Sequence, residues 1–429
     1  MREKKDSGVD WIGHHPMTWE VTRIGSLYLP RNSKVSDTVY APLSVTNKGI
    51  KLQLATVAKT DAHDARKMVR KGDFVINSRS DRRNACGVSS YEGSVSLINT
   101  VLIPQANMHP SYYDWLFRTS QFADEFYKWG HGIVDDLWTT GWQEMKKINI
   151  PYPPLVEQQA IANFLDTKCA EIDALMEDIR AEISTLEEYK KSVITEAVTK
   201  GLNPDAKMKD SGVAWVGECP EHWKILKIRD SISKIESGVS VNAASYPAGD
   251  NEIGVLKTSC VSKYIFDARE NKAVNKNEES RVSCPVRKGC IIVSRMNTPD
   301  LVGACGYVAE EVNGIYLPDR LWQVHVKTTY SAQYVTYYLM SHIARSYYAS
   351  IAVGTSSTMQ NISQIEFGCM FFCVPEIEEQ QAIADYLDAK CDEIAATIAE
   401  KQKQLTTLEE YKKSLIYEYV TGKKEVPTL

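Results

Sequence analysis

The sequence of 429 residues lacks a run of about 18 or more apolar residues, and this absence argues against a membrane-spanning helix. Its first residues, MREKKDSG, are charged and no apolar segment follows them, so they do not resemble a secretory signal. The ten cysteines include no CxxC pair, and their spacings do not match common zinc sites. We therefore expect a cytoplasmic protein with mostly reduced, buried cysteines, and we assign no metal ligand.

Motifs that would supply catalysis are also absent. The sequence has no Walker loop GxxxxGK[ST], no GxGxxG, no GxSxG elbow and no HExxH. NIPYPP at 149–154 has the wrong order for the [NDS]PP[YFW] motif of DNA adenine methyltransferases, and PDAKMKD at 204–210 matches a nuclease PD…xK pattern only faintly. We therefore expect a binding protein and assign no catalytic residue.

What the sequence does contain is a repeat. The segment DSGVDWIGHHPMTWEVTRI at 6–24 recurs as DSGVAWVGECPEHWKILKI at 210–228. A longer segment that begins EQQAIANFLDTK at Glu157 recurs from Glu379, with about 25 of 43 positions identical. The two intervening stretches differ in length and sequence, so a duplicated frame holds two diverged inserts. Such long repeats argue against a solenoid.

The longer segments are predicted to be helices with an apolar seam every seven residues. The seam comprises Leu165, Ile172, Ile179, Leu186 and Val193 in the first copy, and Leu387, Ile394, Leu408 and Leu415 in the second. Lys401 interrupts the second seam where Ile179 stands in the first, and a polar residue at such a position often fixes register or partner choice. The helices could each pack on their own domain, but pairing with each other as a spacer explains the seams better.

Boundary residues and charge support the helices. Prolines precede both segments, and Gly201 and Gly422 follow the last periodic residues. Residues 157–199 carry ten acids and four bases, and residues 379–421 carry nine acids and five bases. The net charge of the whole chain is −5, so the rest of the chain is positive and could bind a polyanion.

We predict an α/β (α+β) fold with two similar mixed domains and two long helices. The predicted limits are a first recognition domain at 1–154, a first helix at 155–203, a second domain at 204–375, and a second helix with a tail at 376–429. Apolar runs FVINS (74–78) and CIIVSR (290–295) each follow a Lys-Gly pair and predict corresponding strands. The aromatic stretches 111–129 and 331–349 have helical spacing, and core packing is their expected role.

Three loops in each insert are candidates for DNA contact. The first loop carries Arg79, Arg82, Arg83 and Asn84, and its counterpart carries Arg295, Asn297 and Thr298. Arginine reads guanine edges and asparagine reads adenine, although solvated turns would have the same composition. The second pair of loops, 128–142 and 352–363, includes Ser356, Ser357, Thr358, Gln360 and Asn361, which could equally cap the following segment. The third pair, 44–51 and 256–263, offers Lys48, Lys257 and Thr258.

This layout resembles the specificity subunit of a type I restriction–modification system over essentially the whole chain. The strongest motifs are Ser211-Gly212-Val213 with Trp215, Gly217, Pro220 and Trp223, and the helix start PPLVEQQAIA. The resemblance implies an antiparallel coiled-coil spacer and a pseudo-twofold repeat in which each domain reads one half of a split, asymmetric target in double-stranded DNA. It also implies two methyltransferase subunits and restriction/translocase subunits as partners. S-adenosylmethionine, ATP and Mg would then belong to those partners, with no cofactor in this chain.

Alternatives stay open from the sequence. A coiled-coil scaffold or adaptor without DNA readout would explain the acidic helices, but not two similar inserts with basic loops. A fused enzyme lacks the necessary motifs. An orphan or phase-variable specificity chain would have the same sequence features, and neighbouring genes would discriminate among these possibilities.

Overall fold

The structure is a computed structural model that describes residues 2–53, 64–105, 107–132, 138–356 and 359–427. Its contacts divide the chain into two compact units: unit 1 is Met1–Arg180 with Gln402–Leu429, and unit 2 is Ala181–Lys401. Two long helices, α5 (Leu155–Lys200) and α10 (Ile377–Val420), contribute one part to each unit. The predicted domain limits stay predictions. None of the described helices is long and apolar enough to cross a membrane.

Each unit is built around an antiparallel four-stranded sheet. In unit 1 the order is β10-β9-β12-β4, with strands Cys86–Val88, Phe74–Asn77, Asn99–Pro104 and Tyr28–Pro30. In unit 2 the order is β22-β20-β24-β17, with strands Cys305–Tyr307, Ile291–Ser294, Leu321–Val326 and Ile232–Ser237. The two predicted strands after the Lys-Gly pairs are therefore β9 and β20, the second strand in each order.

The central strands are apolar on both faces because both faces are covered. Successive side chains of a strand point to opposite faces. In β9, Phe74 and Ile76 therefore enter one core cluster while Val75 enters another, and in β20 Ile291 and Ile292 divide in the same way. This double burial explains why these strands have no polar alternation in the sequence.

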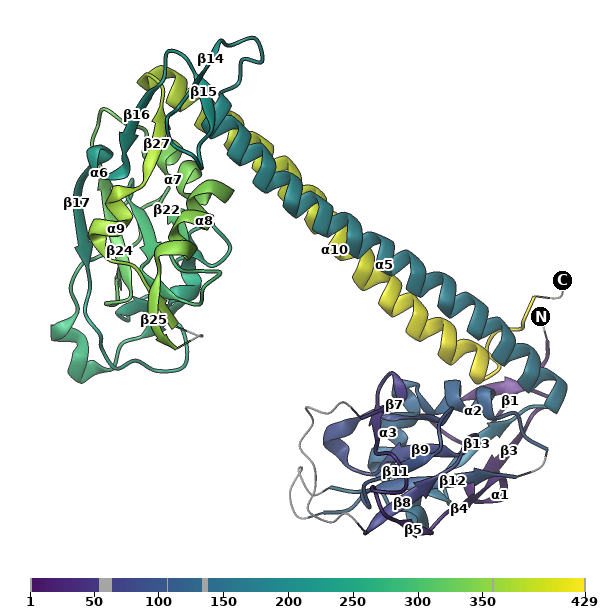
Figure 1. The fold of residues 1–429 in the computed structure, drawn as a ribbon. Coiled ribbons are helices and arrows are strands. Elements are labelled where there is room, and N and C mark those ends of the chain that lie inside the picture. Colours follow the sequence, from purple (N-terminus) through teal and green to yellow (C-terminus); the bar gives the residue numbers. More distant parts are fainter. Residues whose placement is uncertain (1, 54–63, 106, 133–137, 357–358, 428–429) are drawn as a thin grey trace. The chain divides into compact units, whose positions relative to one another are not determined.

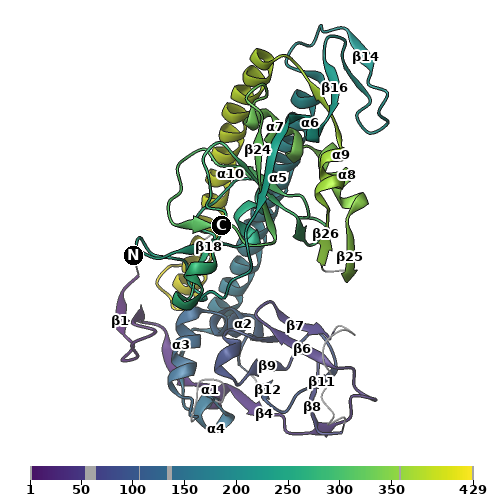
Figure 2. The same cartoon turned by 90° about the vertical axis from the view of Figure 1, so that its left-hand side faces the viewer.

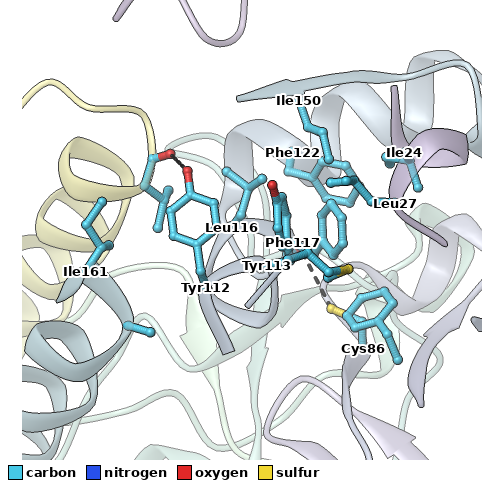
Figure 3. Close-up of a cluster of buried hydrophobic side chains, with 14 of the residues drawn as sticks. Ile24, Leu27, Cys86, Tyr112, Tyr113, Leu116, Phe117, Phe122, Ile150 and Ile161 are labelled. Atoms are coloured by element: carbon cyan, nitrogen blue, oxygen red, sulfur yellow. Dashed lines mark hydrogen bonds between the residues drawn. The ribbon is translucent and has the colours of Figure 1, made fainter. Parts of the chain in front are cut away.

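Helices cover one face of each sheet. In unit 1 these helices are α2 (Pro110–Phe117) and α3 (Ser120–Lys128), and in unit 2 they are α7 (Ala332–Met340), α8 (His342–Ile351) and α9 (Gln364–Cys369). Each predicted aromatic stretch is thus two helices, since Thr119 and Ser341 cap new helix starts through their hydroxyls. Figure 3 shows aromatic rings of α2 and α3 packed together in the core of unit 1, as the sequence predicted.

The opposite faces carry smaller strands. Unit 1 has a three-stranded sheet β11-β8-β5 (Gly93–Val95, Arg66–Val69, Lys34–Val35) and a hairpin of β6 (Leu43–Thr46) and β7 (Gly49–Leu52). Unit 2 has β19-β18-β23 (Asn271–Ala273, Gly254–Leu256, Ile315–Tyr316) and the 3-10 helices η3 (Thr258–Val261) and η4 (Lys276–Arg281). The two units therefore share their central sheet and helices but differ on this second face.

The Trp-rich segments form the same frame in both units. In unit 1, β1 (Lys4–Asp6) pairs with β2 (His14–Pro16), and β3 (Glu20–Arg23) pairs with β13 (Asn149–Tyr152) directly before α5. In unit 2, β14 (Met208–Asp210) pairs with β15 (Glu218–Pro220), and β16 (Lys224–Lys227) pairs with β27 (Phe371–Val374) directly before α10. The short helices α1 (Ile24–Leu27) and α6 (Ile228–Ser231) follow. Each segment thus ties one insert to the start of its own long helix.

The end of the other long helix completes each frame. The Tyr112 hydroxyl donates to the Val420 carbonyl oxygen at the end of α10 (2.7 Å; Figure 3), and the Tyr334 hydroxyl donates to Val198 at the end of α5 (3.2 Å). Gly201 and Gly422 follow these ends with φ of +78° and +70°, which favours glycine, as predicted for helix-ending positions. The doubled Trp-rich segment therefore serves two frames, each of which holds a helix start and a helix end.

The long helices pack together in both units and run antiparallel (Figure 1). In unit 1, Lys412 pairs with Asp173 (2.6 Å) and Arg180 with Glu409 (3.7 Å); in unit 2, Lys401 pairs with Glu182. Of the predicted seam, Leu165, Ile172, Ile179, Leu387, Ile394 and Leu415 are buried, whereas Leu186, Val193 and Leu408 are half-buried. The predicted fold of two mixed α/β domains and two paired helices is confirmed.

Candidate nucleic-acid interface

In unit 1, two of the three predicted DNA loops join into one surface. Arg79, which follows β9, forms a bridge with Thr139, and Thr139 forms a second bridge with His131. The Thr140 amide also donates to the carbonyl oxygen of Ser78 (2.9 Å). We call the joined segments 78–84 and 129–141, as far as they are described, ribbon 1.

In unit 2, the corresponding loops form a three-stranded sheet, which we call ribbon 2. Its strands are β21 (Met296–Asn297), β26 (Met359–Asn361) and β25 (Val353–Ser356), in the order β21-β26-β25. Figure 2 shows β25 and β26 side by side. Gly354 is required there, because a Cβ atom at this position would lie 2.0 Å from the Met359 carbonyl oxygen.

The two ribbons have the same pattern of backbone hydrogen bonds but carry different side chains. Ser78 and Arg295 occupy equivalent positions, because the carbonyl oxygen of each accepts a hydrogen bond from the returning strand of its ribbon. The Thr140 amide donates to Ser78 O, and the Ile362 amide donates to Arg295 O (3.1 Å). One residue further on, Arg79 bridges to Thr139 and Met296 pairs with Asn361. A common scaffold with exchanged side chains is what two readers of different sequences require.

The arginines of ribbon 1 are not equivalent. Arg82 lies in the 3-10 helix η1 (Ser80–Arg82), and its side chain is 67% exposed with a loose contact to Asp81 (3.4 Å). Arg83 donates to Asp124 (2.7 Å), and its guanidinium lies over the Tyr127 ring, 4.9 Å from the centroid. Arg82 is therefore free to contact a ligand, whereas Arg83 would first have to leave two partners.

Asn84 has an unusual conformation for a residue with a side chain. Its φ of +59° lies in the left-handed region, which asparagine tolerates better than most residues. Its Oδ1 atom is buried and has no hydrogen-bond partner among the described residues. An unpaired buried acceptor is costly unless a ligand or water satisfies it, so Asn84 stays a candidate contact residue.

In ribbon 2, the side chain of Asn297 is held by two local hydrogen bonds. The Asn297 amide donates to the Ser294 hydroxyl (3.1 Å), and its Oδ1 accepts the Thr298 amide N–H (2.9 Å). By contrast, Arg295 Nε and Asn361 Oδ1 are buried without a partner in the described structure. Ser356 lies on β25 and Gln360 on β26, whereas Ser357 and Thr358 lie outside the described residues.

The third pair of loops differs in local structure between the units. Lys48 is exposed in the turn of the β6–β7 hairpin, where its amide donates to the Thr46 hydroxyl (3.1 Å). Lys257 precedes η3, which begins at Thr258, and the Lys257 ammonium pairs with Glu270 (3.1 Å). A DNA phosphate would therefore compete with Glu270 for Lys257, whereas the Lys48 ammonium has no partner among the residues that the structure describes.

The buried residues that hold each helix start were not predicted from the sequence. Gln158 is fully buried, donates to Pro153 O (2.8 Å) and accepts the His109 amide N–H (2.8 Å). Gln380 donates to Pro375 O (2.9 Å) and accepts the Ser331 amide N–H (2.9 Å) in the same way. The available signal was the second glutamine at the same place in both EQQA segments. These residues position the helices and lie away from the ribbons.

The cysteines form no reactive or metal-binding site in the part of the chain that the structure describes. All ten are free, and eight of them are buried. Burial raises the pKa of the Cys305 thiol to about 12 and that of Cys290 to about 11, so both thiols stay protonated at neutral pH. No group of three or more His, Cys, Asp or Glu side chains among the described residues could hold a metal ion.

A doubled frame that carries two related ribbons defines a protein with two similar domains. The chain matches the family model for the type I restriction modification DNA specificity domain over residues 140–185 and 220–407, and it belongs to this family. It is similar to the type I restriction enzyme MjaVIII specificity subunit of Methanocaldococcus jannaschii (26% identity, covering 66% of this chain and 64% of that protein). It is also similar to the putative MjaX specificity subunit of that organism (24% identity, covering 83% and 79%).

Solved structures share the fold. A chain from a structural study of complex assembly and conformational transition of the type I R-M system matches with a TM-score of 0.70 and 14% identity, over 95% of this chain and 98% of that chain. The HsdS subunit from Thermoanaerobacter tengcongensis matches with a TM-score of 0.51 and 16% identity, over 96% and 98%. At these identities the likeness establishes the fold alone.

Proposed function

We propose that this chain is the DNA sequence-recognition subunit of a type I restriction–modification complex. Each ribbon would read one half of a bipartite, asymmetric target in double-stranded DNA. The observation that carries this proposal is the shared ladder with exchanged side chains: Ser78 and Arg79 in ribbon 1 stand where Arg295 and Met296 stand in ribbon 2. An exchange of side chains on a constant backbone changes which base edges are contacted without changing how the domain docks.

The chain itself would supply binding and geometry, and its partners would supply chemistry. Two methyltransferase subunits would bring S-adenosylmethionine, and restriction/translocase subunits would bring ATP and Mg. Methylation of an adenine in a duplex requires that the base be flipped out of the stack, which a recognition subunit assists by holding the flanking sequence. The acidic helices α5 and α10, with net charges of −6 over 157–199 and −4 over 379–421, would repel DNA and favour protein partners.

The test is a methylome comparison. The chain is co-expressed with the methyltransferase encoded beside its gene in a host without DNA methylation, and modified bases are mapped by single-molecule sequencing. A new bipartite motif with methyladenine in each half supports the proposal. Co-purification of an active methyltransferase with this chain, without any new motif, contradicts it and favours the alternative of a coiled-coil scaffold without DNA readout.

A further inference from the structure

A fourth loop lies beside each ribbon and was not singled out in the sequence. In unit 1 it is the segment 96–98 between β11 and β12, and in unit 2 it is the segment 317–320 between β23 and β24. The Ser78 amide donates to the Ile98 carbonyl oxygen (3.3 Å), and the Arg295 amide donates to the Arg320 carbonyl oxygen (3.1 Å). Ile98 and Arg320 therefore occupy equivalent places, one residue before β12 and β24.

Backbone hydrogen bonds connect this loop to the returning strand of each ribbon. Ile98 O accepts from Ser78, whose own carbonyl accepts from Thr140; Arg320 O accepts from Arg295, whose own carbonyl accepts from Ile362. In each unit, backbone hydrogen bonds thus join the loop to the strand segment of the ribbon beside it. The loop therefore lies directly beside the ribbon at this position.

The two loops present opposite chemistry at this place. In unit 1, Leu97 and Ile98 are 44% and 39% exposed, although they are aliphatic. They line a groove together with Asn32, Lys67, Ser78 and Thr139, so the groove runs along the edge of ribbon 1.

In unit 2, Arg320 is exposed and its side chain has no ion pair or hydrogen bond with any residue that the structure describes. Most other arginines of unit 2 have such partners: Arg269 pairs with Asp267 (2.9 Å) and Arg281 with Glu278. An arginine without a partner among the described residues and an exposed aliphatic pair thus stand at the same place beside the two ribbons.

We propose that this fourth loop determines part of the DNA specificity of each unit, an inference that rests on the proposed function. Arg320 would donate two hydrogen bonds to O6 and N7 of a guanine in the second half of the target. Leu97 and Ile98 would contact the C5 methyl group of a thymine in the first half. The loop thus reads one base position in each half, and the two positions differ in kind because the side chains differ.

The experiment compares the target motifs and the DNA binding of a single and a double variant of the full chain, each co-expressed with its methyltransferase. Arg320→Ala is expected to relax one guanine position in the second half, with about ten- to hundredfold less discrimination there, and to leave the first half unchanged. Ile98→Ser with Leu97→Ser is expected to relax one thymine position in the first half by about three- to tenfold. Binding is measured on duplexes that differ at that one position, at constant salt.

Matched controls are Arg269→Ala, another exposed arginine of unit 2, and Leu29→Ser, an aliphatic residue 52% exposed on β4 outside the groove. Both controls are expected to keep the wild-type motif. The proposal is overturned if Arg320→Ala keeps every base preference, or if it weakens binding to all duplexes equally, as loss of a phosphate contact would. A wild-type chain that yields no motif would instead overturn the proposed function, and the loop assignment with it.

Discussion

The starts of the two long helices are built alike, whereas the ribbons carry different side chains on the same backbone. Gln158 and Gln380 make the same two backbone hydrogen bonds at the first turns of α5 and α10. At the equivalent ribbon rungs, Ser78 in unit 1 is replaced by Arg295 in unit 2. The repeat has therefore kept the residues that fix the frame and exchanged side chains on the ribbons. The comparison separates positions that the frame keeps from positions that are free to differ, without any other sequence.

The frame itself tolerates some exchange. In unit 1, Glu157 accepts the Trp19 indole N–H (2.8 Å) and pairs with Arg2 (2.6 Å). In unit 2, Glu379 is contacted by His222 (2.9 Å), and the Trp223 indole N–H has no partner among the described residues. The tryptophan rings are buried in both units, so packing is the common requirement and the hydrogen bond is not.

The side chains that connect the central strand to the edge strand of the sheet also differ between the two units. Asp73, before β9, pairs with Arg31 through two hydrogen bonds (2.6 and 2.9 Å). At the same place in unit 2, Cys290 contacts His325 (3.4 Å), which contacts Glu236 (2.6 Å). Either network satisfies the buried polar groups at this site, so the fold constrains the position but not the chemistry.

The largest effect is expected from lengthening both helices. Seven residues inserted after Arg180 and seven after Lys401 preserve the seam phase and add about 10 Å of helix. If the helices set the distance between the half-sites, the gap in the methylated motif should grow by about two to three base pairs, and the original target should lose modification. An unchanged gap, with both half-sites intact, would show that the helices do not measure it.

The next largest effect concerns the arginines of ribbon 1. Replacement of Arg79, Arg82 and Arg83 by alanine is expected to reduce discrimination at the first half-site by about a hundredfold and to leave the second half unchanged. Among the single variants, Arg83→Ala should have the smallest effect, because Asp124 and Tyr127 already hold this side chain. Competition binding with half-site variants of the duplex measures both.

The control for this experiment is the reciprocal change, Arg295→Ala in ribbon 2, which should affect the second half-site alone. Equal losses at both halves from either change would contradict the assignment of one half-site to each unit.

A smaller effect, on folding, is expected from the buried glutamines. Gln158→Leu leaves Pro153 O and the His109 amide buried without partners, which costs about 3 kcal/mol in free energy of unfolding. Gln380→Leu should cost a similar amount, since its contacts are the same. Urea denaturation of the full chain measures the loss. The neighbouring exposed residue provides the control: Gln159→Leu should be nearly neutral.

The long helices, the doubled frame and the central strands could be predicted because their signals are local and repeated. The seven-residue repeat of apolar residues can be recognised within a single helix, and β9 can be recognised as a short apolar run. The aromatic helices were predicted for the same reason, although the breaks at Thr119 and Ser341 were not.

The assembly of the interface could not be predicted because it depends on pairing between distant segments. No pattern in the sequence places Thr139 beside Arg79, or Arg320 beside Arg295. The exposed Ile98 and Arg320 look ordinary in the sequence, and they become informative only when the backbone hydrogen bonds show that they occupy equivalent places. The partners that hold Arg83 and Lys257 were also invisible, because Asp124 and Glu270 are remote or belong to another element.

The residues at equivalent seam positions of the two long helices predict that exchanging them has opposite effects on the free energy of unfolding. Lys401 stands in the seam of unit 2 where Ile179 stands in unit 1, and it pairs with Glu182, whose counterpart in the other copy is Gln404. Lys401→Ile should therefore raise the free energy of unfolding by about 1 kcal/mol, because apolar packing replaces a partly buried charge. Ile179→Lys should lower it by about 2 kcal/mol, since Gln404 offers no charge. Thermal unfolding of both variants measures this, and equal shifts of the same sign would contradict the asymmetry.

The smallest expected effect is on the stability of unit 2 at acidic pH, through the hydrogen-bond network of Glu236. The ammonium of Lys234, with hydrogen bonds from His325 and Gln323, lowers the pKa of Glu236 from 4.5 to about 2. Because the pKa is lower in the folded state, Glu236 stabilises unit 2 above about pH 4.5, and this contribution is lost as the pH falls towards 2. Glu236→Gln removes the titrating group, so the urea midpoints of the variant and the wild-type chain should differ at pH 6 and converge as the pH falls to about 2. A constant difference across this range would show that the carboxylate acts by hydrogen bonding alone.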